Sequence, residues 1–261
     1  MPTAPKPGHA DVATLTLRAA DGVRLAATHV AGPGRDIAVV VAHGFSGHHR
    51  KPGLAAIVRG LSAYAGVVAF DFRGHGASGG LSTLGDREVL DVDAAVATAR
   101  RLGYARVVTC GWSMGGSSVI RHAALHGGVD AVISVSATSR WYVRDTPPMR
   151  RLHWLVERRL GRVVSRHVMR TRIADAWEAV PESPVEVVSR IAPIPLLIVH
   201  GDRDAYFTLE HPQALAAAAG PTAELWIVPG FAHAESGATP ALLDRIGGYL
   251  PGLLARMPAA G

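Results

Sequence analysis

From Ile37 to the end of the chain, short apolar runs alternate with longer runs of helical spacing, and this alternation limits the folds open to the sequence. The short runs predict buried strands at 37–42, 67–70, 106–110, 131–135, 195–199 and 224–228. A strand that is apolar on both sides needs cover on both faces, as in a mostly parallel sheet between two layers of helices. Helical spacing at 86–102, 116–126 and 240–254 supplies such layers. An expected hairpin, 14–19 with 24–30, brings this α/β sheet to about eight strands.

One stretch breaks the alternation. From about residue 139 to residue 190 no buried strand is expected, and the sequence is rich in arginine and punctuated by proline. We expect one α/β domain over 13–261 that carries this stretch as a helical cap insertion, preceded by a disordered tail at 1–12. Apolar residues at helical spacing between Met149 and Val168 predict that the cap packs an apolar side on the core and leaves its arginines in solvent.

The positive charge of the chain is concentrated in the same stretch. The net charge is +6 and the pI is near 10.1, which by themselves would suit a nucleic-acid-binding protein. Ten arginines lie between Arg140 and Arg172 against two acidic residues, however, and the rest of the chain is close to neutral. Because the positive charge is confined to the cap, a nucleic acid is a less favoured partner. Contact of the cap with a membrane surface remains an alternative.

The sequence lacks two features that would place the protein in or across a membrane. No apolar run approaches the roughly 20 residues of a membrane-spanning helix. The N-terminal residues have no apolar core of the secretory-signal kind, so we expect a cytoplasmic protein.

The expected strand at 106–110 leads into Gly111-Trp112-Ser113-Met114-Gly115, a serine between two glycines. Glycine at both positions allows the backbone to turn sharply from strand into helix. Such a turn places the serine hydroxyl above the sheet edge, at the N-terminus of the next helix, where free backbone N–H groups stabilise an anion. Ser113 is therefore a candidate nucleophile.

A serine nucleophile needs a base, and the base needs a carboxylate that fixes its tautomer. Asp202 and Asp204 follow one predicted strand, and His233 follows the next. The chain order serine, aspartate, histidine is the one expected of this arrangement. His200 is a second candidate base, but it lies within a strand end, where a structural role is favoured.

Four segments in register, each at the end of a predicted strand, resemble the α/β-hydrolase-fold enzymes of the serine esterase, lipase and thioesterase type. They are His43-Gly44-Phe45, Asp71 to Ser78, Gly111 to Gly116, and His200 to Asp204 followed by Gly230 to His233. The resemblance covers nearly the whole chain outside the tail and the cap. It implies Ser113 as nucleophile, Asp204 as acid and His233 as base. It also implies an oxyanion hole formed by the backbone N–H groups of Phe45 and Met114.

The activity implied by the resemblance is cleavage of a small-molecule carboxylic ester or thioester through an acyl-enzyme on Ser113. An acyltransferase, lactonase, amidase or perhydrolase would use the same residues. A catalytically silent binding module that works through the basic cap is a further alternative. No nucleotide-binding motif follows a strand, and no His, Asp or Glu cluster of the zinc type is present, so we expect no cofactor and no metal.

Candidate substrate-binding residues lie at the elbow or in the cap. They are Trp112, Trp141, Tyr142, Trp154, Arg158 and Arg159. The aromatic residues would supply apolar contact area. The arginines would suit a substrate that carries an anionic group such as a phosphate.

Overall fold

The central sheet of the computed structural model, which describes residues 12–257, has the strand order β1-β2-β4-β3-β5-β6-β7-β8. The strands are β1 (Val12–Arg18), β2 (Arg24–Val30), β3 (Ile37–Ala42), β4 (Gly66–Phe70), β5 (Arg106–Trp112), β6 (Ala131–Val135), β7 (Leu196–Gly201) and β8 (Ala223–Val228). The pairs β1–β2 and β2–β4 are antiparallel, and every pair from β4 through β8 is parallel. The eight-stranded, mostly parallel sheet expected from the sequence is confirmed.

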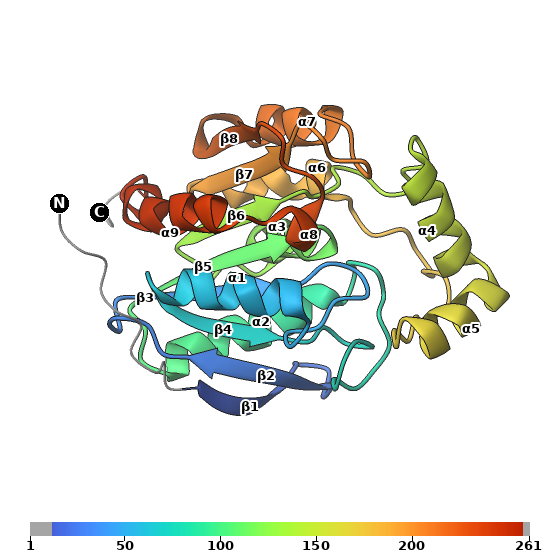
Figure 1. Cartoon of the computed structure of the whole chain (residues 1–261), viewed down its shortest axis with the longest axis horizontal. Coiled ribbons are helices and arrows are strands. Elements are labelled where there is room, and N and C mark those ends of the chain that lie inside the picture. The colour runs from blue at the N-terminus through green and yellow to red at the C-terminus, as the bar shows by residue number, and fades with distance from the viewer. Residues whose placement is uncertain (1–11, 258–261) are drawn as a thin grey trace.

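Helices cover both faces of the sheet (Figure 1). The helices of the two layers are α1 (Pro52–Ser62), α2 (Glu88–Arg101), α3 (Met114–Leu125), α7 (Glu210–Ala219) and α9 (Pro240–Leu254). Successive residues of β3 point to opposite sides. Val40 belongs to the buried cluster that contains residues of α2, α3 and α7, while Val39 and Val41 belong to the cluster that contains residues of α1 and α9. This two-sided burial explains why the strand is apolar throughout.

Most element boundaries lie within two residues of those expected, and β2, β3, β6 and α9 coincide with them. The helices α1 and α7 were not expected. The tail expected at 1–12 lies outside the described residues, except for Val12, which begins β1. Among residues 12–257 no helix combines the length and the apolar character needed to cross a bilayer.

The segment expected as the cap lies between β6 and β7. It contains α4 (Pro147–Glu157), α5 (Arg159–Val168), α6 (Pro184–Val187) and the short helix η1 (Val188–Ile191). The helices α6 and η1 pack on α3, whereas α4 and α5 stand apart from both layers, beyond one edge of the body (Figure 1). Between them the backbone of Arg158 is extended, with φ −92° and ψ 138°.

The expectation that the apolar stripe of this segment packs on the core is wrong for α5. Leu160, Val163 and Val168 are exposed, and the buried residues of α5 are Gly161 and Ser165. The reason is a close approach between the two helices, since a Cβ at Gly161 would lie 2.5 Å from the carbonyl oxygen of Trp154. Gly161 therefore faces α4, and Leu160, Val163 and Val168 are left in solvent.

Candidate active site

Ser113 occupies a sharp turn between β5 and α3. Its φ of 53° lies in the left-handed region, which a residue with a Cβ adopts only under strain, and such strain is typical of functional sites. The glycines on either side leave no room for a side chain. A Cβ at Gly111 would overlap the carbonyl oxygen of Gly115, and a Cβ at Gly115 would overlap that of Ala42.

The ends of β5, β7 and β8 bring Ser113, Asp204 and His233 into one hydrogen-bonded chain. The Ser113 hydroxyl lies 2.9 Å from Nε2 of His233. On the other side of the ring, Nδ1 of His233 donates to Oδ2 of Asp204 at 2.8 Å. The three residues predicted from the sequence are thus placed in direct contact in the predicted order.

Asp204 is buried and accepts hydrogen bonds on both oxygens. Its Oδ1 accepts from the backbone N–H groups of Tyr206, at 2.8 Å, and Phe207, at 3.1 Å. Burial by itself would raise the pKa of Asp204, but the hydrogen bonds from His233 and from the two N–H groups outweigh it and hold the pKa below its usual value. The carboxylate therefore stays ionised and fixes the His233 tautomer with its proton on Nδ1.

The competing residues take other positions. Asp202 is exposed and accepts a hydrogen bond from the backbone N–H of Gly230 at 2.7 Å. His200 is fully buried, and its Nε2 donates to the carbonyl oxygen of Phe207 at 3.0 Å. Both side chains hold the loops that carry Asp204 and His233.

The two expected oxyanion donors lie beside the serine. Met114 is the first residue of α3, and Phe45 follows the β3 strand end. Both residues line the cavity that contains Ser113. Within residues 12–257 neither backbone N–H donates a hydrogen bond to another protein group, so both are open to a ligand.

A buried histidine holds the loop that carries Phe45. His43 donates from Nδ1 to the carbonyl oxygen of Gly44 at 2.7 Å, and its Nε2 accepts from the backbone N–H of Phe72 at 3.0 Å. Burial, followed by the nearby His75, lowers the pKa of His43 to about 3. The ring is therefore neutral, as one donated and one accepted hydrogen bond require.

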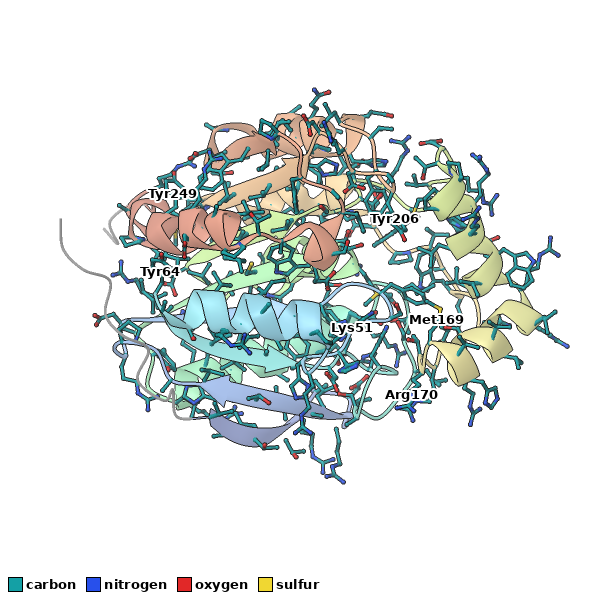
Figure 2. The ribbon with its side chains drawn as sticks, in the orientation of Figure 1. Lys51, Tyr64, Met169, Arg170, Tyr206 and Tyr249 are labelled. Atoms are coloured by element: carbon teal, nitrogen blue, oxygen red, sulfur yellow. The ribbon has the colours of Figure 1, made fainter. Side chains whose placement is uncertain are left out.

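Two further residues join the site, and no motif predicted them. Glu235 is half-buried, and its Oε1 accepts the backbone N–H of Gly44 at 2.6 Å, which ties the His233 loop to the loop of Phe45. The ring of Tyr206 stacks on the His233 ring with 4.2 Å between centroids. Tyr206 lies on the side of the body that faces α4 (Figure 2). The one available signal was proximity in the chain, since each lies two residues from a candidate catalytic residue.

A cavity of about 240 Å³ adjoins Ser113. Its walls are mainly apolar and aromatic, and they come from the loops at the sheet edge and from one side of α4. The larger apolar residues among them are Phe45, Met114, Trp141, Tyr142, Val143, Met149, Leu152, Val156, Trp177 and Phe207. The carboxylates in the lining are paired, Glu157 with His153 at 2.6 Å and Asp175 with Arg162 at 3.2 Å.

The candidate substrate-binding residues divide into two groups. Trp141 and Tyr142 line the cavity. The other four lie outside its lining: Trp112 is fully buried below the elbow, and Trp154, Arg158 and Arg159 are exposed to solvent. A direct role for these four in holding substrate stays a prediction.

The family model for serine aminopeptidase, S33, matches residues 34–181, more than half of the chain. The chain belongs to this family. The match spans the Phe45 loop, the elbow and part of the segment between β6 and β7. The protein is thus a hydrolase of the α/β-hydrolase fold, as the resemblance implied.

Solved structures of hydrolases with low sequence identity show the same fold. The esterase Pf2001 of Pyrococcus furiosus has a TM-score of 0.72 and 22% identity, and the match covers 93% of each chain. Est1E of Butyrivibrio proteoclasticus, solved with ferulic acid bound, has a TM-score of 0.64 and 21% identity over 92% of this chain and 99% of its own. XC6422 of Xanthomonas campestris, described as a serine hydrolase without lid, has a TM-score of 0.61 and 19% identity over 96% and 97%. No curated protein matches the sequence.

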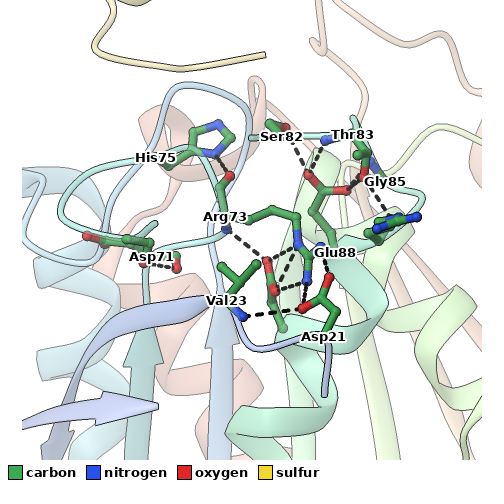
Figure 3. Close-up of polar contacts among 12 residues, drawn as sticks. Asp21, Val23, Asp71, Arg73, His75, Ser82, Thr83, Gly85 and Glu88 are labelled. Carbon is green, nitrogen blue, oxygen red and sulfur yellow. Dashed lines mark hydrogen bonds and ion pairs between the residues drawn. The ribbon is translucent and has the colours of Figure 1, made fainter. Parts of the chain in front are cut away.

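In this hydrolase one wall of the cavity is held by buried charges behind it (Figure 3). Ser82, Thr83 and Leu84 line the cavity. The fully buried Glu88 accepts from the Ser82 hydroxyl at 2.8 Å and from the Thr83 hydroxyl at 2.7 Å. Beside it, Arg73 bridges the carboxylates of Asp21 and Asp91, each at 2.7 Å. Because the buried Glu88 carboxylate is satisfied by hydrogen bonds from this loop, including the backbone N–H groups of Thr83 and Gly85, the loop that carries this wall is fixed in place.

Proposed function

We propose that the protein cleaves a carboxylic ester or thioester with an apolar acyl group, through an acyl-enzyme on Ser113. The observation that supports it best is the hydrogen-bonded chain from Asp204 through His233 to Ser113, at the wall of an apolar cavity. His233 takes the serine proton as the oxygen attacks the acyl carbon. The bond to the leaving group then breaks, and the alcohol or thiol leaves with the proton held by His233.

In the second half of the reaction, water attacks the acyl-enzyme and His233 again accepts and returns a proton. The tetrahedral intermediate of each half carries a negative oxygen. The N–H groups of Phe45 and Met114 would donate to it, and one such donor is worth about 3 kcal/mol of transition-state stabilisation. Asp204 stabilises the imidazolium that accompanies the tetrahedral intermediate in each half of the reaction.

The cavity wall favours a neutral, apolar acyl group. Trp141, Tyr142 and Trp177 bring aromatic surface to one part of it. The arginines of the lining, Arg140 and Arg162, already pair with carboxylates, Arg140 with Glu210 at 2.9 Å. Since α4 forms part of the wall, the segment at 139–190 would act as a cap that shapes the acyl site.

An aminopeptidase is the second candidate, because the family model carries that description. Recognition of a free α-ammonium group needs an unpaired carboxylate or a cluster of carbonyl oxygens. The lining carboxylates are both ion-paired with arginine, Glu157 with Arg144 at 2.7 Å and Asp175 with Arg162 at 3.2 Å. This pairing favours an ester over an amino-terminal peptide.

The test has two stages. A fluorophosphonate probe should label the wild-type protein and not Ser113→Ala; absence of labelling of the wild type would contradict the acyl-enzyme proposal. p-Nitrophenyl esters of increasing acyl length are then compared with p-nitroanilides of single amino acids. We expect turnover of esters with a maximum at an acyl length that fills the cavity. Faster cleavage of the anilides would support the aminopeptidase instead.

A further inference from the structure

The outer side of α4 and α5 exposes large apolar side chains to solvent. The exposed fractions are 65% for Leu160, 53% for Val163 and 76% for Val168 on α5, and 48% for Trp154 on α4. Single exposed apolar residues are common, but several on one short helix pair form an apolar patch. The patch follows from the packing of Gly161 against α4, which turns the apolar side of α5 away from the body.

Arginines surround these apolar residues. Arg159 and Arg166 lie four residues before and three residues after Val163, so they flank it on the same side of the helix. On α4, Arg151 precedes Trp154 by three residues. Arg151, Arg158, Arg159 and Arg166 are exposed, and within residues 12–257 none of them forms an ion pair. We call these four arginines, with Trp154, Leu160, Val163 and Val168, the outer face.

The outer face lies on the same helix pair that shapes the cavity. Met149, Leu152 and Val156 on the opposite side of α4 line the cavity next to Ser113, and α5 follows α4 after the single residue Arg158. Both helices stand free at one edge of the molecule, away from the described ends of the chain (Figure 1). The edge can therefore meet an extended surface without obstruction from the sheet layers.

We propose that the outer face binds the surface of an anionic lipid bilayer. An amphipathic helix with apolar side chains on one side and arginines beside them lies in the interface, with its apolar groups among the acyl chains and its cations at the phosphates. A second copy of the chain fits less well, because a two-fold contact would place two faces that both carry unpaired arginines against each other. The inference rests on this surface alone and stands whether or not the proposed ester cleavage is correct.

Binding is measured with Ser113→Ala, which removes the serine oxygen and so prevents hydrolysis of the lipid during the assay. The protein is sedimented with large vesicles of phosphatidylcholine alone or with 30% phosphatidylglycerol. We expect binding to the anionic vesicles that weakens by about tenfold or more when salt is raised from 0.1 to 0.5 M, since exposed charges are then screened. Absence of binding to anionic vesicles at low salt would overturn the proposal.

Two variants of the outer face separate its apolar and charged parts. Leu160→Ser with Val163→Ser should reduce binding about tenfold or more, and so should Arg151→Glu with Arg166→Glu. The matched control is Arg24→Glu with Arg106→Glu, two exposed arginines elsewhere that give the same change of net charge. This control should keep most of the binding. Equal losses in the control would indicate attraction by net charge alone and would contradict a defined docking face.

Two readouts complete the test. The same substitutions are also made in the protein that retains Ser113. These variants should hydrolyse a short, water-soluble ester at the wild-type rate, since none of the substituted residues lines the cavity. Sedimentation equilibrium without lipid measures self-association. A dimer that dissociates on Leu160→Ser with Val163→Ser would assign the face to a second copy and overturn the lipid proposal.

Discussion

At the scale of single residues, the sequence offers two aspartates and two histidines for the site, and the loops bring only one of each to Ser113. Asp202 and Asp204 are both available in the turn after β7, yet only Asp204 reaches Nδ1 of His233. His200 lies at the end of β7 and His233 follows β8, yet only His233 reaches the hydroxyl of Ser113. Each choice follows from loop geometry, because the rejected side chain is engaged in holding the loop.

The two aspartates should therefore differ sharply in their effect on turnover. Asp204→Asn should lower kcat on an activated ester by on the order of 10⁴-fold, because an amide cannot hold the imidazole in the same tautomer or stabilise the imidazolium. Asp202→Asn should leave kcat within a few fold. Steady-state kinetics on p-nitrophenyl acetate measures both, and similar losses in the two variants would contradict the assignment of Asp204.

Glu235 should act as a positioning residue for the loop of Phe45. Removing its hydrogen bond to Gly44 in Glu235→Ala should lower kcat about tenfold with little change in KM, as expected for a hydrogen bond worth about 1.5 kcal/mol that supports the transition state. Glu235→Gln should retain most of the activity, because its amide oxygen can accept the same N–H. The control is Glu178→Ala, which removes an exposed glutamate outside the cavity lining. A rise in KM with kcat unchanged would indicate contact with bound substrate instead.

At the scale of elements, the junction of β5 and α3 is the most constrained part of the chain. The strained Ser113 is held between Gly111 and Gly115, whose missing side chains permit α3 to approach β3 and β5. Because α3 lies this close to β3 and β5, a side chain added at Gly111 or Gly115 would push the backbone apart and displace the Ser113 hydroxyl.

Gly115→Ala should lower the free energy of unfolding by about 2 kcal/mol or more and abolish labelling by a fluorophosphonate, since backbone has to move to admit the methyl group. Gly248 on α9 is the matched control, because a Cβ there meets no atom within 4 Å. Gly248→Ala should be neutral or stabilise the protein by about 0.5–1 kcal/mol. Urea unfolding monitored by circular dichroism compares the two, and equal stability would contradict the packing argument.

At the scale of the whole molecule, buried neutral histidines link stability to pH. Burial, followed by the nearby His75, lowers the pKa of His43 to about 3. Burial, followed by the charge of Arg140, lowers the pKa of His211 to about 4. His211 accepts hydrogen bonds on Nδ1 from the backbone N–H and the hydroxyl of Ser139, which a protonated ring could not do.

In the unfolded chain these histidines take up protons near pH 6.5, whereas in the folded protein they do so only at much lower pH. Their contribution to stability is thus complete above about pH 6.5 and falls as the pH is lowered toward 4. We expect the urea midpoint to drop across this range, and to drop less in His211→Asn, whose amide oxygen can accept from Ser139 without titrating. A midpoint that does not change with pH would contradict the burial of neutral rings.

The sequence by itself determined the sheet, and with the family resemblance it predicted the three residues that form the hydrogen-bonded chain. Strands such as β3 and β6 are apolar on both sides because both faces are covered, and this pattern is visible without coordinates. Ser113, Asp204 and His233 each follow such a strand, and parallel strands end at one edge, so their proximity could be predicted. The roles of Glu235 and Tyr206 could not be predicted, because their contacts depend on how separate loops fold over the same edge of the sheet.

Only the tertiary structure decided the orientation of α4 and α5. Periodicity located apolar residues between Met149 and Val168, but it could not show that part of them would face solvent. α5 approaches α4 at Gly161, because packing against the backbone at this distance leaves no room for a side chain. The spacing of apolar residues shows that a helix has an apolar side. Whether that side is buried or exposed depends on the elements that pack around the helix.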